Sequence, residues 1–177
     1  PEGLAFEGIR ALLSHLFVLA DKRFYAPRHN HGLMQDIALA RAASLVPGLA
    51  EATRLNQIAQ DRFLKKQVQQ SIDPEHIHKE NSPGYQFFFL RLLNRSSLDP
   101  ELGEDLRASL HQAKLDLVKS LQFFIQPDLK LAAFGDTKRF DVAAEMGKRG
   151  FRKWRQQDPE FKSIYQMLMN TARRPVA

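Results

Sequence analysis

Apolar side chains recur at helical spacing along almost the whole chain, and no alternating strand pattern of useful length appears. Along the first segment the apolar positions Ile9, Leu12, Leu13, Leu16 and Ala20 fall on one side of a helix. The periodicity predicts helices over about 4–24, 31–45 and 49–70, a fourth from 83, a fifth after Asp99-Pro100, and a weaker helical remainder ending near Met169.

Two kinds of helix alternate in this pattern. The helices over 31–45 and from 83 are apolar on nearly every face, whereas those over 49–70 and through Leu106–Phe124 are apolar on one side. A helix that is apolar all round is buried on most sides. The pattern therefore predicts an all-α array of antiparallel helical hairpins, with inner helices covered by outer ones.

Polar and turn residues mark the helix ends. Ser82 precedes Pro83, which predicts an N-cap followed by proline in the first helical position. The segment "LAAFGDT", residues 131–137, predicts an apolar loop with a tight turn, in which Asp136 stabilises the turn.

Composition narrows the classes of function. The 177 residues, 44% of them hydrophobic, suit one or two folded domains. The absence of cysteine excludes disulfides, thiolate metal sites and thiol nucleophiles. The longest apolar run, Leu12–Ala20, is too short for a membrane span. The chain opens inside an expected helix, so we interpret it as a piece of a longer protein.

Positive charge is concentrated in one segment. Of the net charge of +6, a surplus of five arises between Lys138 and Arg155, where seven Lys and Arg stand against Asp141 and Glu145. A solvated basic face is one interpretation. The alternative is a non-catalytic helical module that binds nucleic acid or a protein through residues 138–155. The segment has few aromatics and no recognisable nucleic-acid motif, so we expect no nucleic-acid partner.

Two helix starts are expected at the same end of the array. The helix over 31–45 travels roughly 21 Å at about 1.5 Å per residue, and the next helix returns at least as far. Helix starts carry unpaired N–H groups and partial positive charge, and Gly32 and Gly84 would leave room for a ligand. The prediction is a pocket for an anionic group, formed by Asn30, His31 and Tyr85, with Glu80 and Asn81 beside it.

Each of these residues also has a plainer interpretation. Asn30 could be an N-cap beside a surface His31, and Tyr85 a half-buried core aromatic. Glu80 could be a simple helix-start carboxylate. His76 and His78 have the spacing of a strand-like metal pair but lack a third ligand, so no metal is expected.

Three segments together resemble a known family. "NHG" at 30–32, "KENSPGYQFFFLRLL" at 79–93 and "LAAFGD" at 131–136 resemble, in order, the N-terminal helical domain of the heparinase II/III-like polysaccharide lyases, which include alginate lyases. The resemblance runs from about Arg28 to Asp136, with 54 positions between His31 and Tyr85. Gln86 stands where a histidine is common in the family.

The resemblance implies a fold and an activity. The fold would be an incomplete α/α toroid, of which residues 1–177 form a fragment. Residues 138–177 form its C-terminal helical segment, to which the resemblance does not extend. In the family an antiparallel β-sheet domain follows the toroid and usually supplies a second catalytic histidine; that domain is absent from this chain. The substrate would be an anionic uronate polysaccharide, such as alginate or a glycosaminoglycan, cleaved by β-elimination without a cofactor. The protein would be a periplasmic or secreted bacterial one.

The resemblance also assigns roles. Asn30 and His31 would bind and neutralise the uronate carboxylate, Tyr85 would be the catalytic tyrosine, and Glu80 and Asn81 would contact substrate. The chemistry suits these residue types, because removing the C5 proton builds negative charge that hydrogen-bond donors must stabilise. Tyr85 could protonate the leaving glycosidic oxygen or remove the C5 proton.

Overall fold

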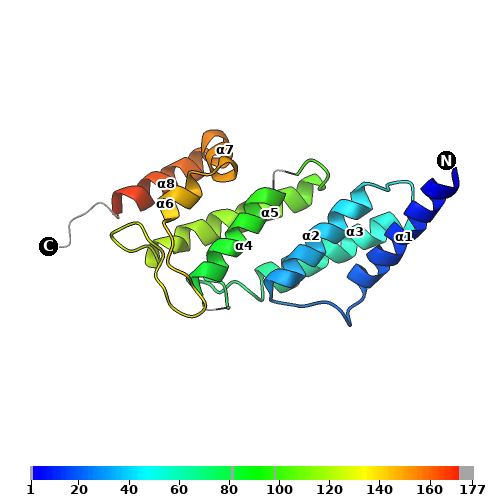
Figure 1. The fold of residues 1–177 in the computed structure, drawn as a ribbon, viewed down its shortest axis with the longest axis horizontal. Coiled ribbons are helices and arrows are strands. Elements are labelled where there is room, and N and C mark those ends of the chain that lie inside the picture. The colour runs from blue at the N-terminus through cyan, green and yellow to red at the C-terminus, as the bar shows by residue number, and fades with distance from the viewer. Residues whose placement is uncertain (1, 81, 98, 172–177) are drawn as a thin grey trace. The chain divides into compact units, whose positions relative to one another are not determined.

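The protein is all-α. The computed structural model describes residues 2–80, 82–97 and 99–171, and within these ranges it contains helices and isolated β-bridges but no strand. None of the helices described there is both long and apolar enough to cross a bilayer. The elements are α1 (Glu2–Ala20), α2 (Asn30–Ser44), α3 (Ala50–Arg62), η1 (Phe63–Val68), α4 (Pro83–Ser96), α5 (Glu104–Ser120), η2 (Leu121–Phe123), α6 (Val142–Met146), α7 (Arg149–Gln157) and α8 (Pro159–Thr171). Figure 1 labels the α-helices.

The chain divides into two compact units. The first comprises Pro1–Gln70 and Pro100–Leu106, and the second comprises Ser71–Asp99 and Arg107–Ala177.

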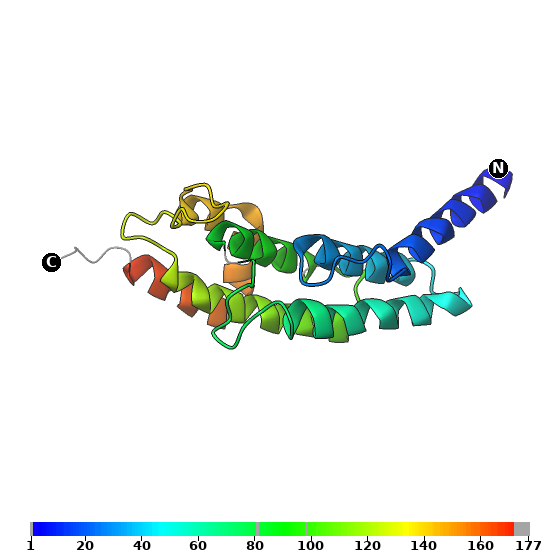
Figure 2. The ribbon, with the colours of Figure 1, turned by 90° about the horizontal axis from the view of Figure 1, so that it is seen from below.

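In the first unit, α2 and α3 form a hairpin, and α1 packs against both. Figure 2 shows α3 and η1 running alongside α2. The core of this unit includes Leu16, Leu33, Leu39, Leu55 and Phe63, all at most 2% exposed. Helix α2 is buried on most sides, as the pattern predicts, but it keeps an exposed strip of Met34, Ala38 and Arg41.

Helix α1 ends earlier than its periodicity indicates. It stops at Ala20 instead of continuing to residue 24, because the Asp21 carboxylate accepts a hydrogen bond from the Arg23 N–H at 2.9 Å and turns the chain. Ile9, expected on the buried side, is 48% exposed.

The third helix changes its winding near its end. Residues 63–68 form a π-helix, in which the Gln69 N–H bonds the Leu64 carbonyl at 3.0 Å. The buried positions Leu55, Ala59, Phe63 and Gln67 nevertheless continue along one side at a spacing of four, so the expected amphipathic pattern is preserved.

In the second unit, an aromatic cluster joins α4, α7 and α8. The rings of Phe87 and Phe151 lie 5.6 Å apart, and Trp154 stacks on Phe161 at 3.5 Å. Helix α5 belongs to this unit from Arg107 onward and there buries Leu110, Ala113 and Leu117 of the predicted stripe.

Candidate functional site

The first half of the predicted site is the N-terminus of α2, in the first unit. Arg28 has a left-handed φ of 60°, and His29 follows in extended conformation as the N-cap, with no side-chain capping hydrogen bond. Asn30 is therefore the first helical residue and not the cap, which removes its plainer interpretation. The first-turn N–H groups of a helix lack intrahelical acceptors, so this end favours an anion.

Three side chains gather at this helix end. The Asn30 side chain is 6% exposed, and its Oδ1 lies 3.1 Å from Nδ1 of His29. With a proton on Nδ1, His29 donates to Oδ1 and fixes the amide. The exposed rings of His29 and His31 meet edge to face, with centroids 4.8 Å apart. Sequence reasoning assigned no role to His29, although the alternation His-Asn-His at a helix start was a usable signal.

Gly32 serves packing and does not open space for a ligand, contrary to our expectation. A Cβ atom there would collide with the Ala26 carbonyl oxygen and lie 2.5 Å from Nε2 of Gln67. Glycine thus allows the loop before α2 to lie directly against the helix.

A buried polar network supports that loop, and sequence reasoning missed it. The Tyr25 hydroxyl donates to Oδ2 of Asp36 at 2.8 Å and accepts from Nε2 of Gln67 at 2.9 Å. The Arg62 guanidinium lies over the Tyr25 ring, 4.3 Å from its centroid. The available signal was Asp36 itself, a carboxyl on the buried side of an apolar helix.

Burial controls the protonation of this network. It raises the pKa of Asp36, which is 1% exposed, from 3.8 to about 7, although the Tyr25 hydrogen bond and the Arg62 charge lower it. Burial and the Asp36 charge also raise the pKa of Tyr25. The loop before α2 is therefore held to this helix by the Tyr25–Asp36 hydrogen bond, and the Asp36 carboxyl is neutral in mildly acidic solution.

The second half of the predicted site is the N-terminus of α4, in the second unit. Ser82 is the N-cap and Pro83 is the first helical residue, as predicted, but the Ser82 hydroxyl does not cap the helix. It bonds the Thr137 hydroxyl at 2.7 Å, and Oγ1 of Thr137 accepts the Gly84 N–H at 2.8 Å. A Cβ on Gly84 would lie 3.1 Å from that oxygen, so Thr137 and not a ligand occupies the space beside Gly84.

Tyr85 lies half-buried in the first turn of α4. In the described part of the chain no hydrogen bond joins its hydroxyl to another residue, so the phenol is available to an external partner. Glu80 is half-buried in the preceding loop, and its N–H donates to Nδ1 of His78 at 3.4 Å. Asn81, the other predicted substrate contact, lies outside the described residues.

Gln86 and His78 have structural roles. Oε1 of Gln86 accepts the His78 N–H at 3.2 Å, and its Nε2 donates to the Ser120 hydroxyl at 2.6 Å. The His78 ring packs on Phe89 with centroids 4.5 Å apart. Across the residues that the structure describes, no group of three or more His, Asp or Glu could hold a metal ion.

The basic segment 138–155 is partly neutralised. Arg139 pairs with Asp128 at 2.5 Å, Lys148 pairs with Glu145, and the Arg155 guanidinium lies 4.5 Å from the Tyr165 ring centroid. Of its aromatic residues, Phe151 and Trp154 are at most 4% exposed, and the half-buried Phe140 ring packs on Phe87 with centroids 5.0 Å apart, so none presents an open ring face for a base.

The structure thus brings Asn30 and His31 together with His29 in the first unit, and it places Glu80 and Tyr85 in the second. Comparison with known proteins finds no matching family model, no similar curated protein and no similar solved structure.

Proposed function

We propose that this chain is the helical part of a polysaccharide lyase that cleaves an anionic uronate polysaccharide, such as alginate or a glycosaminoglycan, by β-elimination. In this proposal the helical hairpins belong to an incomplete α/α toroid, Asn30 and His31 bind the uronate carboxylate, and Tyr85 is the catalytic tyrosine. The observation that carries the proposal is the start of α2, where an amide and an imidazole lie at a helix N-terminus that no side chain caps.

Asn30 and His31 neutralise the carboxylate. His29 holds Oδ1 of Asn30, which leaves the Nδ2 hydrogens to donate to a carboxylate oxygen, and a protonated His31 donates to the same group. The partial positive charge of the helix start adds to both donors. As C5 loses its proton, negative charge spreads onto the carboxylate, and fixed donors stabilise that charge more than the ground state.

Tyr85 acts on the bond that breaks. A base removes the C5 proton, its electron pair forms the C4–C5 double bond, and the C4–O bond breaks with its electrons going to the glycosidic oxygen. The Tyr85 hydroxyl, which has no partner in the described part of the chain, can donate the proton that this oxygen requires. The base is either Tyr85 itself as a phenolate or a histidine from the β-sheet domain that the resemblance implies. No metal or cofactor enters this scheme.

The test is turnover of alginate and glycosaminoglycans by the protein, expressed together with whatever sequence its gene encodes on either side of these 177 residues. Ultraviolet absorbance of the unsaturated uronate product reports each cleavage. We expect Tyr85→Phe to lower kcat by roughly 10²- to 10⁴-fold, because it removes a general acid or base. The matched control is Tyr165→Phe, which deletes a hydroxyl from a half-buried tyrosine in α8 and should leave turnover unchanged. Full activity in Tyr85→Phe would refute the assigned role.

A further inference from the structure

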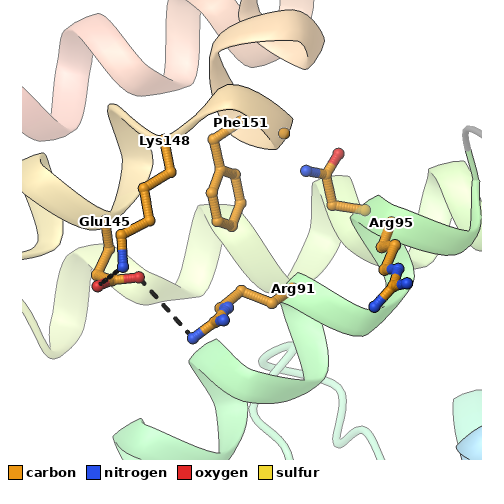
Figure 3. Close-up of a pocket in the computed structure, with 7 residues that line it drawn as sticks. Arg91, Arg95, Glu145, Lys148 and Phe151 are labelled. Carbon is orange, nitrogen blue, oxygen red and sulfur yellow. Dashed lines mark hydrogen bonds and ion pairs between the residues drawn. The ribbon is translucent and has the colours of Figure 1, made fainter.

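A pocket of about 310 Å³ lies between α4 and α7 of the second unit, and none of the residues that the lyase proposal uses lines it. Figure 3 shows the Arg91 side chain reaching from α4 toward Glu145, with the Lys148 and Phe151 side chains opposite α4. Arg95, further along α4, lines the pocket as well. Asn94 and Gly150 complete its lining. Nothing in the proposed reaction accounts for this pocket.

The charges that line the pocket favour an anion. Three cationic side chains, Arg91, Arg95 and Lys148, face a single carboxylate, Glu145. That carboxylate pairs with Lys148 and lies 3.8 Å from Arg91. Arg95 is exposed and has no ion-pair partner among the described residues. Two positive charges therefore remain in excess.

The first turn of α7 adds backbone donors on the same side. This helix has nine residues, its N-cap Lys148 makes no side-chain capping hydrogen bond, and Gly150 and Phe151 of its first turn line the pocket. Their N–H groups belong to the part of a helix that has no intrahelical acceptors.

Asn94 supplies an independent observation. Its side chain is 3% exposed, lines the pocket, and makes no hydrogen bond with any other described residue; its Oδ1 is buried without a partner. Its Nδ2 lies beside the start of α7, 3.5 Å from where a Cβ on Gly150 would be. Buried amides are normally paired, so this one lacks a partner that a ligand could provide.

The two polar atoms of Asn94 distinguish a sugar acid from a bare oxyanion. Nδ2 can donate to an anionic group, but Oδ1 needs a donor, which an inorganic anion without a proton does not have. A sugar hydroxyl is such a donor, and a modest rotation about the soft χ2 of Asn94 turns either atom toward the pocket. An acidic sugar offers a hydroxyl and an anionic group together.

We infer that this pocket binds one acidic sugar unit, with Arg91, Arg95 and the start of α7 holding its carboxylate or sulfate and Asn94 holding a neighbouring hydroxyl. Choosing a sugar as occupant rests on the proposed function. Arg91 and Arg95 follow Tyr85 along α4 by about 9 and 15 Å at a helical rise of about 1.5 Å per residue, so this is a second binding site and not part of the reacting centre.

The direct test is NMR titration of the protein with glucuronate, glucose 6-sulfate, glucose and inorganic sulfate, following the Asn94 side-chain amide and the Gly150 backbone amide. We expect at least one acidic sugar to shift both signals saturably, and the better of the two identifies the anionic group. Glucose and inorganic sulfate should bind at least roughly tenfold more weakly, since each lacks one class of hydrogen bond. Inorganic sulfate binding as well as both acidic sugars would overturn the assignment of a sugar, and no saturable shift with any probe would overturn the site.

Variants test whether the acidic sugar binds in this pocket. Arg95→Gln should weaken acidic-sugar binding by roughly tenfold, the effect of removing one charge-assisted hydrogen bond. Arg152→Gln removes the same charge from an exposed position of α7 outside the pocket lining and should leave binding within about twofold. Gly150→Ala favours the helix but places a methyl group against Asn94, so it should weaken binding while the fold stays intact. Equal affinities for the wild type, Arg95→Gln and Gly150→Ala would contradict the assignment.

Failure of this site and failure of the lyase proposal give different results. If the Asn94 and Gly150 signals respond to an acidic sugar but no polymer is cleaved, the pocket stands and the lyase proposal fails. If polymer is cleaved and Arg95→Gln leaves KM and the titration unchanged, the lyase proposal stands and the pocket assignment fails. Tyr85→Phe should keep the titration unchanged in either case.

Discussion

At the scale of single residues, Asp36 shows how burial sets a charge state. Its carboxyl is 1% exposed, and only Oδ2 has a hydrogen-bond partner among the described residues. Burial disfavours the charged form and outweighs the Tyr25 hydrogen bond and the Arg62 charge, so the pKa rises to about 7. The folded protein therefore holds a proton that the unfolded chain releases near pH 3.8.

The Asp36 proton determines whether the free energy of unfolding rises or falls with pH. Between about pH 4 and 7 the native state binds more protons at Asp36 than the unfolded state does, so its contribution to the free energy of unfolding falls as pH rises. Asp36→Asn mimics the neutral form and can retain a hydrogen bond to Tyr25. The variant should match the wild type near pH 4 and exceed its stability near pH 8 by up to a few kcal/mol, since one pKa unit is about 1.4 kcal/mol.

Thermal unfolding of both proteins at several pH values measures the difference. Asp61→Asn is the control, because Asp61 is half exposed and its partners, Lys65 at 3.7 Å and the Gln57 amide at 3.4 Å, lie on the helix surface. A stability gap between Asp36→Asn and the wild type that is the same at every pH would contradict the assignment.

Sequence reasoning placed individual residues at helix starts correctly where the signal was local. Asn30 and His31 do stand at the start of α2, and Tyr85 stands in the first turn of α4. It failed at Thr137, because that hydroxyl reaches Gly84 across 53 positions of the chain. It also placed a ligand beside Gly32 and Gly84, since a glycine in a sequence does not reveal whether a neighbour fills the space beside it.

At the scale of elements, the N-terminus of α4 is capped by a side chain that is distant in the sequence. A Ser before Pro predicts local capping, yet the Ser82 hydroxyl bonds Thr137, and Thr137 accepts the Gly84 N–H. The loop 131–137 is thereby tied to the helix that carries Tyr85. Capping by a distant hydroxyl couples the stability of a helix end to the folding of a loop.

Removing that hydroxyl should destabilise the second unit. Thr137→Val keeps the shape of the side chain but leaves the Gly84 N–H and the Ser82 hydroxyl without this partner, so we expect a loss of about 1–2 kcal/mol in the free energy of unfolding. Urea unfolding measures it. Thr137→Ser retains the hydroxyl and should lose clearly less; equal losses in the two variants would assign the effect to packing of the methyl group.

The starts of α2 and α4 were predicted more accurately than the end of α1. Periodicity gave the beginnings of α2 and α4 within a residue or two, because Pro27 stands just before α2 and Ser82-Pro83 opens α4. It extended α1 beyond Ala20, since apolar residues continue while Asp21 turns the chain. It also gave no sign of the π-helix over 63–68, because a wider turn changes hydrogen bonding without changing residue types.

At the scale of the whole molecule, the all-helical class followed from periodicity, but the division of the chain did not. Residues 138–177 read as a weak helical remainder, yet Phe151, Trp154 and Phe161 from this stretch supply core aromatics of the second unit. Lys114 of α5 is buried against them, 4.1 Å from the Trp154 ring centroid, and burial lowers its pKa to about 8. A spacing pattern identifies one face of a helix and not the distant elements that cover it.

The net charge of +6 leads to the last prediction, which separates the lyase from the rival binding module. Both bind a polyanion and both weaken with salt, because exposed charges are screened over about 10 Å at 0.1 M. They differ in the residues involved. Lys138, Arg152 and Lys153 are exposed and make no ion pair within the described ranges.

For the lyase, changing these three residues together to Gln should lower affinity for a labelled uronate oligosaccharide only a few-fold and spare turnover, whereas Asn30→Ala should weaken that binding strongly. For a nucleic-acid module, the same triple variant should abolish binding of a DNA duplex, or reduce the slope of log affinity against log salt by roughly 0.9 per lost phosphate contact. Asn30→Ala should leave duplex affinity unchanged. Fluorescence anisotropy at several salt concentrations, with both labelled ligands and both variants, measures these slopes. Tight duplex binding that depends on the three cations, together with no binding of the oligosaccharide, would exclude the lyase. A lyase binds its substrate carboxylate at the start of α2, so its ligand binding should not depend on contacts between a phosphate backbone and residues 138–153.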